Sequence, residues 1–334
     1  MTGSKVTLRT LCACMATAFC LLAGHSAAAS APAKHAAGHR TMSCAYTSHS
    51  EAALARFDAL ARKRASCAVV FANTATTWAD WERPWFLNHQ RDADWAAWAT
   101  APGQGRRLVI TMSMLPPRLA GRNWRRAGAR GRFDGHARAL ARNLVAAGLG
   151  RSIIRLGAEM NGDWNADNVG HTPRDFRLWT RAWRHEVRAM RSVRGAHFRF
   201  DWNVNAAVRP IPLASIYPGD DVVDIVGIDA YDQGVGATHN RWREIYDRPL
   251  GIRDVLRFAK AHHKPLSIPE WGIAPRSVGS GGGDDPSYIR GIASVVRHNR
   301  VAYEAYFYKG PFATELDASH ASLRAYRRYF GGAR

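Results

Sequence analysis

Residues 153–164 read Ile-Ile-Arg-Leu-Gly-Ala-Glu-Met-Asn-Gly-Asp-Trp, and this stretch decides the fold. It begins as a short apolar run, which is typical of a strand buried on both faces, and it ends in a turn rich in Gly, Asn and Asp. Glu159 therefore lies where a strand gives way to a loop, close to Trp164. An α/β barrel keeps its catalytic groups at the carboxyl ends of buried parallel strands. The stretch predicts a barrel strand of this kind with a carboxylate at its end.

A second stretch repeats the same design. Residues 264–272 read Lys-Pro-Leu-Ser-Ile-Pro-Glu-Trp-Gly, an apolar run that ends in Glu270 and is followed by Trp271. Glycoside cleavage needs two carboxylates, because one acts as acid/base and the other as nucleophile or base. The pair Glu159 and Glu270 therefore predicts a glycosidase centre.

Outward from these two stretches, eight apolar segments alternate with helix-like stretches. The apolar segments lie at residues 42–46, 67–72, 107–114, 152–157, 197–203, 222–228, 265–268 and 301–307. The helix-like stretches lie at residues 51–64, 92–100, 133–148, 173–194, 251–262 and 287–298. Strands that alternate with helices imply parallel pairing, so the pattern predicts an α/β fold, a single (β/α)8 TIM-barrel catalytic domain over residues 41–334. A doubly wound open sheet is the alternative, but no G-x-G-x-x-G nucleotide turn follows any strand.

The first 40 residues resemble a targeting segment. Residues 1–29 combine a basic start, an apolar run too short to span a bilayer and a cleavage site of small residues, which predicts a signal peptide. Residues 30–40 are rich in Ala and His and are expected to be a disordered lead-in. We therefore expect export to a periplasm or beyond, without stable insertion in a membrane.

Export limits the cysteines to Cys44 and Cys67, because Cys12, Cys14 and Cys20 belong to the predicted signal peptide. In an oxidising compartment a lone pair of cysteines is a candidate disulfide. Two unpaired buried cysteines are the alternative.

The chain is strongly basic, with a formal net charge of +20 that falls to +18 if Lys5 and Arg9 leave with the signal peptide. The remaining basic residues are mostly Arg, and they are spread along the chain rather than clustered. A bias in composition would explain this charge, and so would an acidic polysaccharide or an anionic envelope surface as partner. We expect no nucleic-acid partner, because no recognition motif is present, and we expect a monomer.

Several motifs resemble glycoside hydrolase family 26, which belongs to a clan of retaining glycosidases and whose known members are mostly β-mannanases. The resemblance covers most of the chain beyond the predicted signal peptide. It rests on Arg155-x-x-x-Glu159-Met160-Asn161-Gly162-x-Trp164, on Phe200-x-Trp202, on Val223-Asp224-x-Val226-Gly227-x-Asp229-x-Tyr231, and on Lys264-Pro265 leading to Glu270-x-Gly272.

The resemblance implies that Glu159 is the acid/base and Glu270 the nucleophile. It also implies that Tyr231 hydrogen-bonds the nucleophile and that Arg155 tunes the charges beneath the site. One position departs from the family, because Ala158 stands where the family usually has a His next to the acid/base. A polar side chain expected to contact the sugar is thus missing, so we expect a different substrate or a lower activity.

Five further residues are predicted to line the substrate site: Trp164, Trp271, Trp202, Asn161 and Asp229. The first two adjoin the carboxylates in sequence and could stack on sugar rings, and Trp202 comes at the end of the fifth strand. Asn161 belongs to the turn expected to hold the carboxyl group of Glu159. Asp229 could also be ordinary loop polarity.

No cofactor and no metal site are expected, since the sequence lacks metal-ligand spacings, a phosphate loop and a G-x-S-x-G elbow. We predict an exported retaining β-glycosidase that hydrolyses a polysaccharide, endo-acting, either β-mannanase-like or exopolysaccharide-degrading. The two carboxyl groups should then lie about 5–5.5 Å apart. Two alternatives stay open: a catalytically weak carbohydrate-binding barrel of the cell envelope, and a basic structural protein of the envelope.

Overall fold

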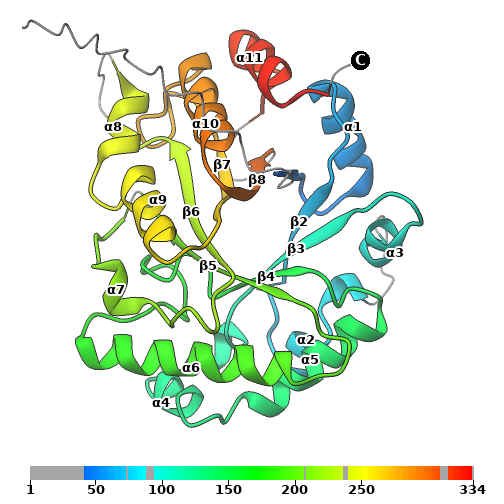
Figure 1. Cartoon of the computed structure of the whole chain (residues 1–334), viewed down its shortest axis with the longest axis vertical. Coiled ribbons are helices and arrows are strands. Elements are labelled where there is room, and N and C mark those ends of the chain that lie inside the picture. The colour runs from blue at the N-terminus through cyan, green and yellow to red at the C-terminus, as the bar shows by residue number, and fades with distance from the viewer. Residues whose placement is uncertain are drawn as a thin grey trace, which may run out of the picture. The chain divides into compact units, whose positions relative to one another are not determined.

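The computed structural model describes residues 41–72, 74–87, 94–206, 208–235, 240–308 and 315–332. These residues form a closed barrel in which eight parallel strands follow one another in chain order, with helices around them (Figure 1). The strands are β1 (Met42–Tyr46), β2 (Cys67–Phe71), β3 (Arg107–Met112), β4 (Ile153–Leu156), β5 (Arg199–Asn205), β6 (Ile225–Asp232), β7 (Leu266–Ile273) and β8 (Val301–Phe307). Strand β8 pairs with β1, so the sheet closes and the predicted (β/α)8 barrel is confirmed. The predicted signal peptide and lead-in lie outside the described residues.

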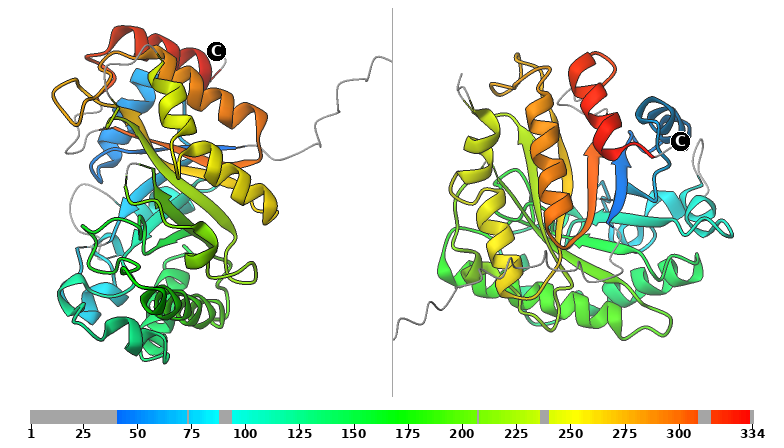
Figure 2. Two further views of the ribbon diagram at one scale, coloured as in Figure 1. Left: turned by 90° about the vertical axis from the view of Figure 1, so that its left-hand side faces the viewer. Right: turned by 45° about the horizontal axis from the view of Figure 1, so that its top comes forward.

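The helices run from α1 to α11 along the chain, with two short 3-10 helices. They are α1 (Glu51–Ala61), α2 (Trp78–Glu82), η1 (Trp85–Leu87), α3 (Trp95–Thr100), η2 (Pro117–Leu119), α4 (Trp124–Gly128), α5 (Asp134–Ala146), α6 (Pro173–Arg191), α7 (Leu213–Ile216), α8 (Arg241–Asp247), α9 (Ile252–Ala261), α10 (Pro286–His298) and α11 (His320–Phe330). Helix α11 contacts α1 and α10, so the last helix closes the outer ring against the first (Figures 1 and 2).

Helix α11 was not expected from the sequence, because its few apolar residues are interrupted by Arg. Its buried face consists of Ser322, Leu323 and Tyr326. The tyrosine ring packs against Trp271 and Phe57, which belong to distant parts of the chain. Tertiary packing rather than sequence periodicity therefore stabilises this helix.

Strand β7 is longer than its apolar run suggests. It continues beyond Ile268 to Ile273, so Glu270 lies inside the strand and not at its end as expected. Its pairing with β8 shifts in register between Ile268 and Trp271, a local irregularity of the kind often found next to active sites. Both neighbouring strands pair with β7 before and after Pro269 and Glu270, although these two residues themselves have no register partner, and this long-range pairing is not visible in the local sequence.

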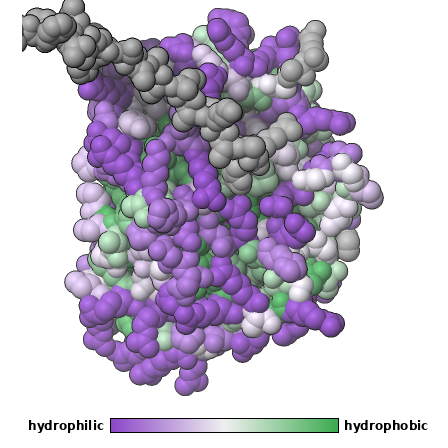
Figure 3. Space-filling model, viewed as in Figure 1, coloured by the Kyte–Doolittle hydropathy of each residue, from purple (hydrophilic) through white to green (hydrophobic). Residues whose placement is uncertain are grey.

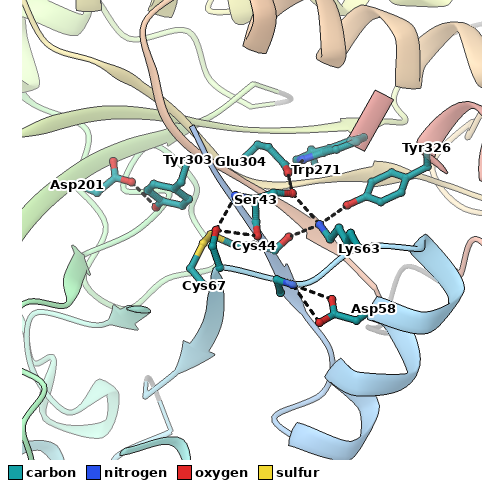
Figure 4. Close-up of a disulfide and its surroundings, with 12 residues drawn as sticks. Ser43, Cys44, Asp58, Lys63, Cys67, Asp201, Trp271, Tyr303, Glu304 and Tyr326 are labelled. Atoms are coloured by element: carbon teal, nitrogen blue, oxygen red, sulfur yellow. Dashed lines mark hydrogen bonds between the residues drawn. A yellow bond between two sulfur atoms is a disulfide. The ribbon is translucent and has the colours of Figure 1, made fainter. Parts of the chain in front are cut away.

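The barrel interior contains a disulfide between Cys44 and Cys67, as predicted. The two cysteines are register partners on β1 and β2, and both are fully buried. Figure 4 shows a polar cluster beside them, in which the Lys63 ammonium donates to the hydroxyls of Ser43 and Tyr326, each at 2.7 Å. The bridge thus joins the first two barrel strands next to a buried charge.

The molecular surface is mainly hydrophilic on the face that Figure 3 shows, with apolar residues in small separate groups. Among the described residues, none of the helices combines the length and the apolar composition that crossing a membrane requires.

Candidate active site

Side-chain alternation along the strands decides which residues face the barrel interior. Neighbouring residues of a strand point to opposite faces, so every second residue points inward. Asp201, Asn203 and Asn205 alternate in this way along β5 and are buried although they are polar. Arg155 on β4 and Asp229 on β6 join Asn203 in one layer, with the guanidinium 2.7 Å from Asp229 and 3.3 Å from the Asn203 amide oxygen.

Three carboxylates meet above this layer. One oxygen each of Glu159, Asp229 and Glu270 lies within 4.8 Å of the others. Such spacing would suit the ligands of a cation, but here a protein cation is in place. The Arg155 guanidinium lies 2.7 Å from Asp229 and 2.9 Å from Glu270. Arg155 therefore offsets part of the negative charge of this cluster, and the arrangement fits paired carboxylates better than a metal centre.

Glu270 is held at both oxygens. Its Oε1 accepts a hydrogen bond from Arg155 at 2.9 Å, and its Oε2 accepts one from the Tyr231 hydroxyl at 3.0 Å. Burial alone would lower the pKa of Arg155, but the carboxylates of Asp229 and Glu270 raise it above its usual value. The guanidinium thus stays charged, and Glu270 has one fixed orientation with a permanent positive partner.

The backbone brings Glu159 into the site through two residues with positive φ. Gly157 (φ 60°) ends β4, and a Cβ at this position would lie 3.2 Å from both Met114 and Trp179. Glu159 itself has φ 52°, a left-handed conformation that costs a non-glycine residue about 1–2 kcal/mol. Its amide donates to the Asn203 carbonyl at 3.1 Å, so β5 supports the strained turn.

The Glu159 carboxyl group accepts two hydrogen bonds, from the Asn205 amide at 2.5 Å and from the Trp164 indole at 3.0 Å. Burial, with a smaller contribution from the negative charge of Glu270, raises its pKa to about 7. A carboxyl group with this pKa can carry a proton near neutrality and give it up. Glu159 therefore has the properties of a general acid, whereas Glu270 is held beside a positive charge.

Asn161 acts on this geometry indirectly. Its side chain donates to the Asn205 carbonyl and accepts from the Asn205 amide N–H, both at 2.9 Å. The residue is buried, so it fastens the loop after β4 to the end of β5 and thereby positions the Asn205 side chain. It supports Glu159, as expected of its turn, but it is not placed to line a substrate cleft.

Trp202 and Trp271 are not in the site, contrary to the sequence prediction. Both are fully buried on the outward face of their strands. Trp202 packs against Tyr217 and Phe258 beneath α9. Trp271 donates its indole N–H to Glu304 at 2.7 Å, as Figure 4 shows. Each tryptophan directly adjoins an inward-facing residue and therefore points away from it.

Trp164 does lie at the site, and its side chain is 56% exposed. Sequence reasoning missed the other aromatic side chains there, which belong to the last residues of β1, β2 and β8. Tyr46 stacks on Phe307 at a ring separation of 4.5 Å and meets Phe71 edge to face at 5.0 Å. Phe307 also contacts Tyr231. These aromatic residues could have been identified by their position at the carboxyl ends of barrel strands. Proximity to a Glu in the sequence does not identify them.

A cavity of about 60 Å³ adjoins Ala158. Its lining consists of Phe71, Thr111, Met112, Ser113, Ala158, Glu159, Asn165, Asp167 and Glu270. The buried Ser113 hydroxyl has no hydrogen-bond partner among the described residues. Burial raises the pKa of Asp167 to about 6, although its carboxylate accepts a hydrogen bond from the Met114 amide at 2.8 Å. Both polar groups were missed from the sequence, and both lie in segments that follow barrel strands.

Comparison with known proteins gives a family match over part of the chain. The sequence profile of glycosyl hydrolase family 26 matches residues 141–262. Endoglucanase H of Acetivibrio thermocellus is 24% identical over 209 residues, which are 60% of this chain and 22% of that protein. The chain thus spans about a fifth of the length of this curated relative.

Solved structures share the fold at low sequence identity. A modular endo-β-1,4-mannanase from Cellulomonas fimi superposes with a TM-score of 0.63 at 16% identity, over 87% of this chain and 70% of that one. A family 26 β-mannanase from Bacteroides ovatus superposes with a TM-score of 0.52 at 11% identity, over 87% of this chain and 88% of that one.

Proposed function

We propose that the chain is a glycoside hydrolase similar to those of family 26, a retaining family, and that it is an exported, endo-acting β-glycosidase that cleaves a polysaccharide by double displacement. The observation that carries this proposal is the contrast between two neighbouring carboxyl groups. Oxygens of Glu159 and Glu270 lie within 4.8 Å, close to the spacing of about 5–5.5 Å typical of retaining enzymes and below the range of inverting ones.

In the first step, Glu270 attacks the anomeric carbon while Glu159 donates its proton to the leaving glycosidic oxygen. The carbon–oxygen bond breaks and a covalent glycosyl-enzyme forms. In the second step, Glu159 takes a proton from water, the water oxygen bonds to the anomeric carbon and Glu270 leaves. Arg155 and Tyr231 hold Glu270 in line for both steps, since each donates to one of its oxygens.

The substrate class follows from the relatives and from the charge. The similar proteins described above are named mannanase or endoglucanase, which suggests a β-linked hexose backbone and endo-action. The formal net charge of +20 favours an acidic polymer. Ala158 removes a polar contact expected of family members, and Ser113 and Asp167 offer other polar groups beside it. We therefore favour an acidic or substituted β-glycan over plain mannan.

Export is proposed on two grounds. The first is the pattern of residues 1–29, a basic start followed by an apolar run and small residues. The second is the disulfide between Cys44 and Cys67, since such bonds persist mainly in oxidising compartments.

The second candidate function is a carbohydrate-binding barrel with little turnover. Ala158 favours it, because the missing polar side chain weakens the expected contact with the reacting sugar. The hydrogen bonds that hold both carboxyl groups speak against it, because binding alone does not require a paired acid and nucleophile.

A reducing-sugar assay on β-mannan, β-glucan and acidic bacterial polysaccharides tests the function. Glu270→Ala should abolish turnover on every substrate. Glu159→Ala should spare the glycosylation step for substrates with good leaving groups, because these need little proton donation. Added azide should then give a β-azide with the Glu159 variant and an α-azide with the Glu270 variant.

The outcomes separate the candidates. Binding without release of reducing ends would favour the carbohydrate-binding barrel. Reversed azide products would exchange the two roles, and full activity in either variant would rule out the mechanism.

A further inference from the structure

Four basic side chains gather at the amino-terminal end of the barrel, opposite to the carboxylates. Arg107, Arg151, His197 and Arg199 line a cavity of about 240 Å³. Arg107 and Arg199 are the first residues of β3 and β5, and the other two lie just before β4 and β5. No part of the proposed reaction uses them.

The strand geometry explains why they converge. Arg107 and Val109 are two residues apart on β3, so their side chains point to the same face of the strand. The same holds for Arg199 and Asp201 on β5. Val109 and Asp201 are fully buried, and Val109 packs with Ile153 inside the barrel. Register pairs join Val109 to Ile153 and Ile153 to Arg199, so the basic residues begin the inward-facing rows of adjacent strands. Their side chains therefore share the lower mouth of the barrel.

Positive charge exceeds negative charge in this cluster. Within the described part of the chain, none of the four side chains makes a hydrogen bond or an ion pair. The next carboxylate along β5 is Asp201, which accepts hydrogen bonds from Tyr303 and from Ser267 at one oxygen and also interacts electrostatically with Arg199. Burial and the neighbouring charges of Arg151 and Arg199 lower the pKa of Arg107. Asp201 thus compensates part of the charge of the three guanidinium groups, which share one recess.

We propose that this cavity, which we call the basal pocket, binds an oxyanion: a phosphate, sulfate or carboxylate group. Guanidinium groups donate in a planar fork that matches such anions, and a recess lined by charges of one sign concentrates its field. The basal pocket lies at the opposite end of the barrel from Glu159 and Glu270, so the inference goes beyond the proposed glycosidase function and does not depend on it.

Thermal unfolding with inorganic phosphate at constant ionic strength tests the proposal. A ligand that binds the folded state raises the melting temperature in a saturable way. We expect this shift in the protein with its natural sequence and its loss in the double variant Arg107→Gln/Arg199→Gln. Removing two mutually repelling charges should leave that variant folded, and far-UV circular dichroism checks it.

Two matched variants control the experiment. Arg177→Gln/Arg181→Gln removes the same charge from exposed positions of α6 and should keep the full phosphate shift. Glu270→Ala should also keep it, which separates the basal pocket from the active site. Equal shifts of the melting temperature in both double variants would mean that phosphate acts by general screening of charge, which would overturn the proposal. The absence of a shift in the protein with its natural sequence would also overturn it.

A further arm of the test identifies the source of the anion. Oligogalacturonate and its neutral methyl ester replace phosphate in the same titration with the Glu270→Ala variant. A shift with the acid alone that is lost with Arg107→Gln/Arg199→Gln supports a polymer carboxylate as ligand. A shift with phosphate alone supports a free phosphate ion at the same pocket.

Discussion

At the scale of single residues, the site works because two chemically identical side chains have different surroundings. Glu270 receives a positive charge from Arg155 and a hydrogen bond from Tyr231. Glu159 is partly buried, feels the charge of Glu270 and receives hydrogen bonds only from neutral donors. An environment that raises the pKa of one carboxyl group, here Glu159, marks that group as the acid.

The pH profile should report this difference. Glu159 must be protonated to act as the acid, and its pKa is about 7, so kcat/KM should fall as the pH rises through about 7. The Asn205 amide hydrogen-bonds the carboxylate and thereby lowers its pKa. Asn205→Ala should therefore move the alkaline limb to higher pH, which a profile of kcat/KM against pH measures.

Asn143→Ala serves as the control for this profile. Asn143 lies on α5 and donates to the Glu82 carbonyl, away from the carboxylates. The alkaline limb of the pH profile should not move in Asn143→Ala. A limb that moves to lower pH in Asn205→Ala would contradict the assignment of Glu159 as the acid.

The positions of Glu159 and Glu270 could be read from the sequence, because each follows an apolar strand segment, whereas Tyr231 and Arg155 came from the family resemblance. Asn205 could have been found as well, since Asp201-x-Asn203-x-Asn205 alternates through an otherwise apolar strand. The positive φ of Glu159 and the cavity beside Ala158 could not be predicted from the sequence, because both result from packing between separate strands and loops.

At the scale of elements, strand alternation overrules proximity in sequence. Trp271 follows Glu270 directly, and the sequence predicts that it stacks on a sugar. The pleat of β7 instead turns its side chain outward to Glu304. Trp164 comes from a loop, where no pleat applies, and it does reach Glu159. Neighbours of a catalytic residue are thus informative on loops and misleading on strands.

This difference predicts opposite effects for two tryptophan variants. Trp271→Phe removes the buried hydrogen bond to Glu304, which should destabilise the fold by about 1–3 kcal/mol without changing KM. Trp164→Phe should leave the melting temperature unchanged but raise KM, because this exposed ring lies beside the acid. Calorimetry and steady-state kinetics on both variants test this prediction. An unchanged melting temperature together with a raised KM in Trp271→Phe would show that Trp271 does contact the substrate.

The disulfide belongs to the same scale, because it joins β1 to β2. In the chain-entropy model, a bridge that closes a loop of this length contributes about 3 kcal/mol. The double variant Cys44→Ser/Cys67→Ser should therefore melt about 5–10 °C lower, with kcat unchanged. Mass spectrometry of a non-reducing digest should recover the linked peptide, and free thiols at both positions would refute the bond.

At the scale of the whole molecule, charge is separated by place. The carboxylates that would perform the reaction lie at the carboxyl end of the barrel, with Arg155 beneath them. The basal pocket lies at the other end and is basic. The chain as a whole carries a formal charge of +20. An acidic polymer would therefore be attracted from a distance by the protein as a whole and then meet a site whose negative charge Arg155 offsets in part.

Salt dependence tests this attraction. Screening by salt limits the reach of surface charges to about 8 Å at physiological ionic strength. Raising the salt from low to physiological concentration should lower kcat/KM on an acidic polysaccharide by about tenfold, the lower end of the range known for electrostatic steering. On β-mannan, which is neutral, the same change should have little effect. Both substrates meet the same carboxylates, so any general effect of salt on the enzyme appears with both. This effect cancels in the ratio of the two kcat/KM values. An equal response to salt with the two substrates would mean that the excess of Arg reflects composition alone and that the substrate is not selected by its charge.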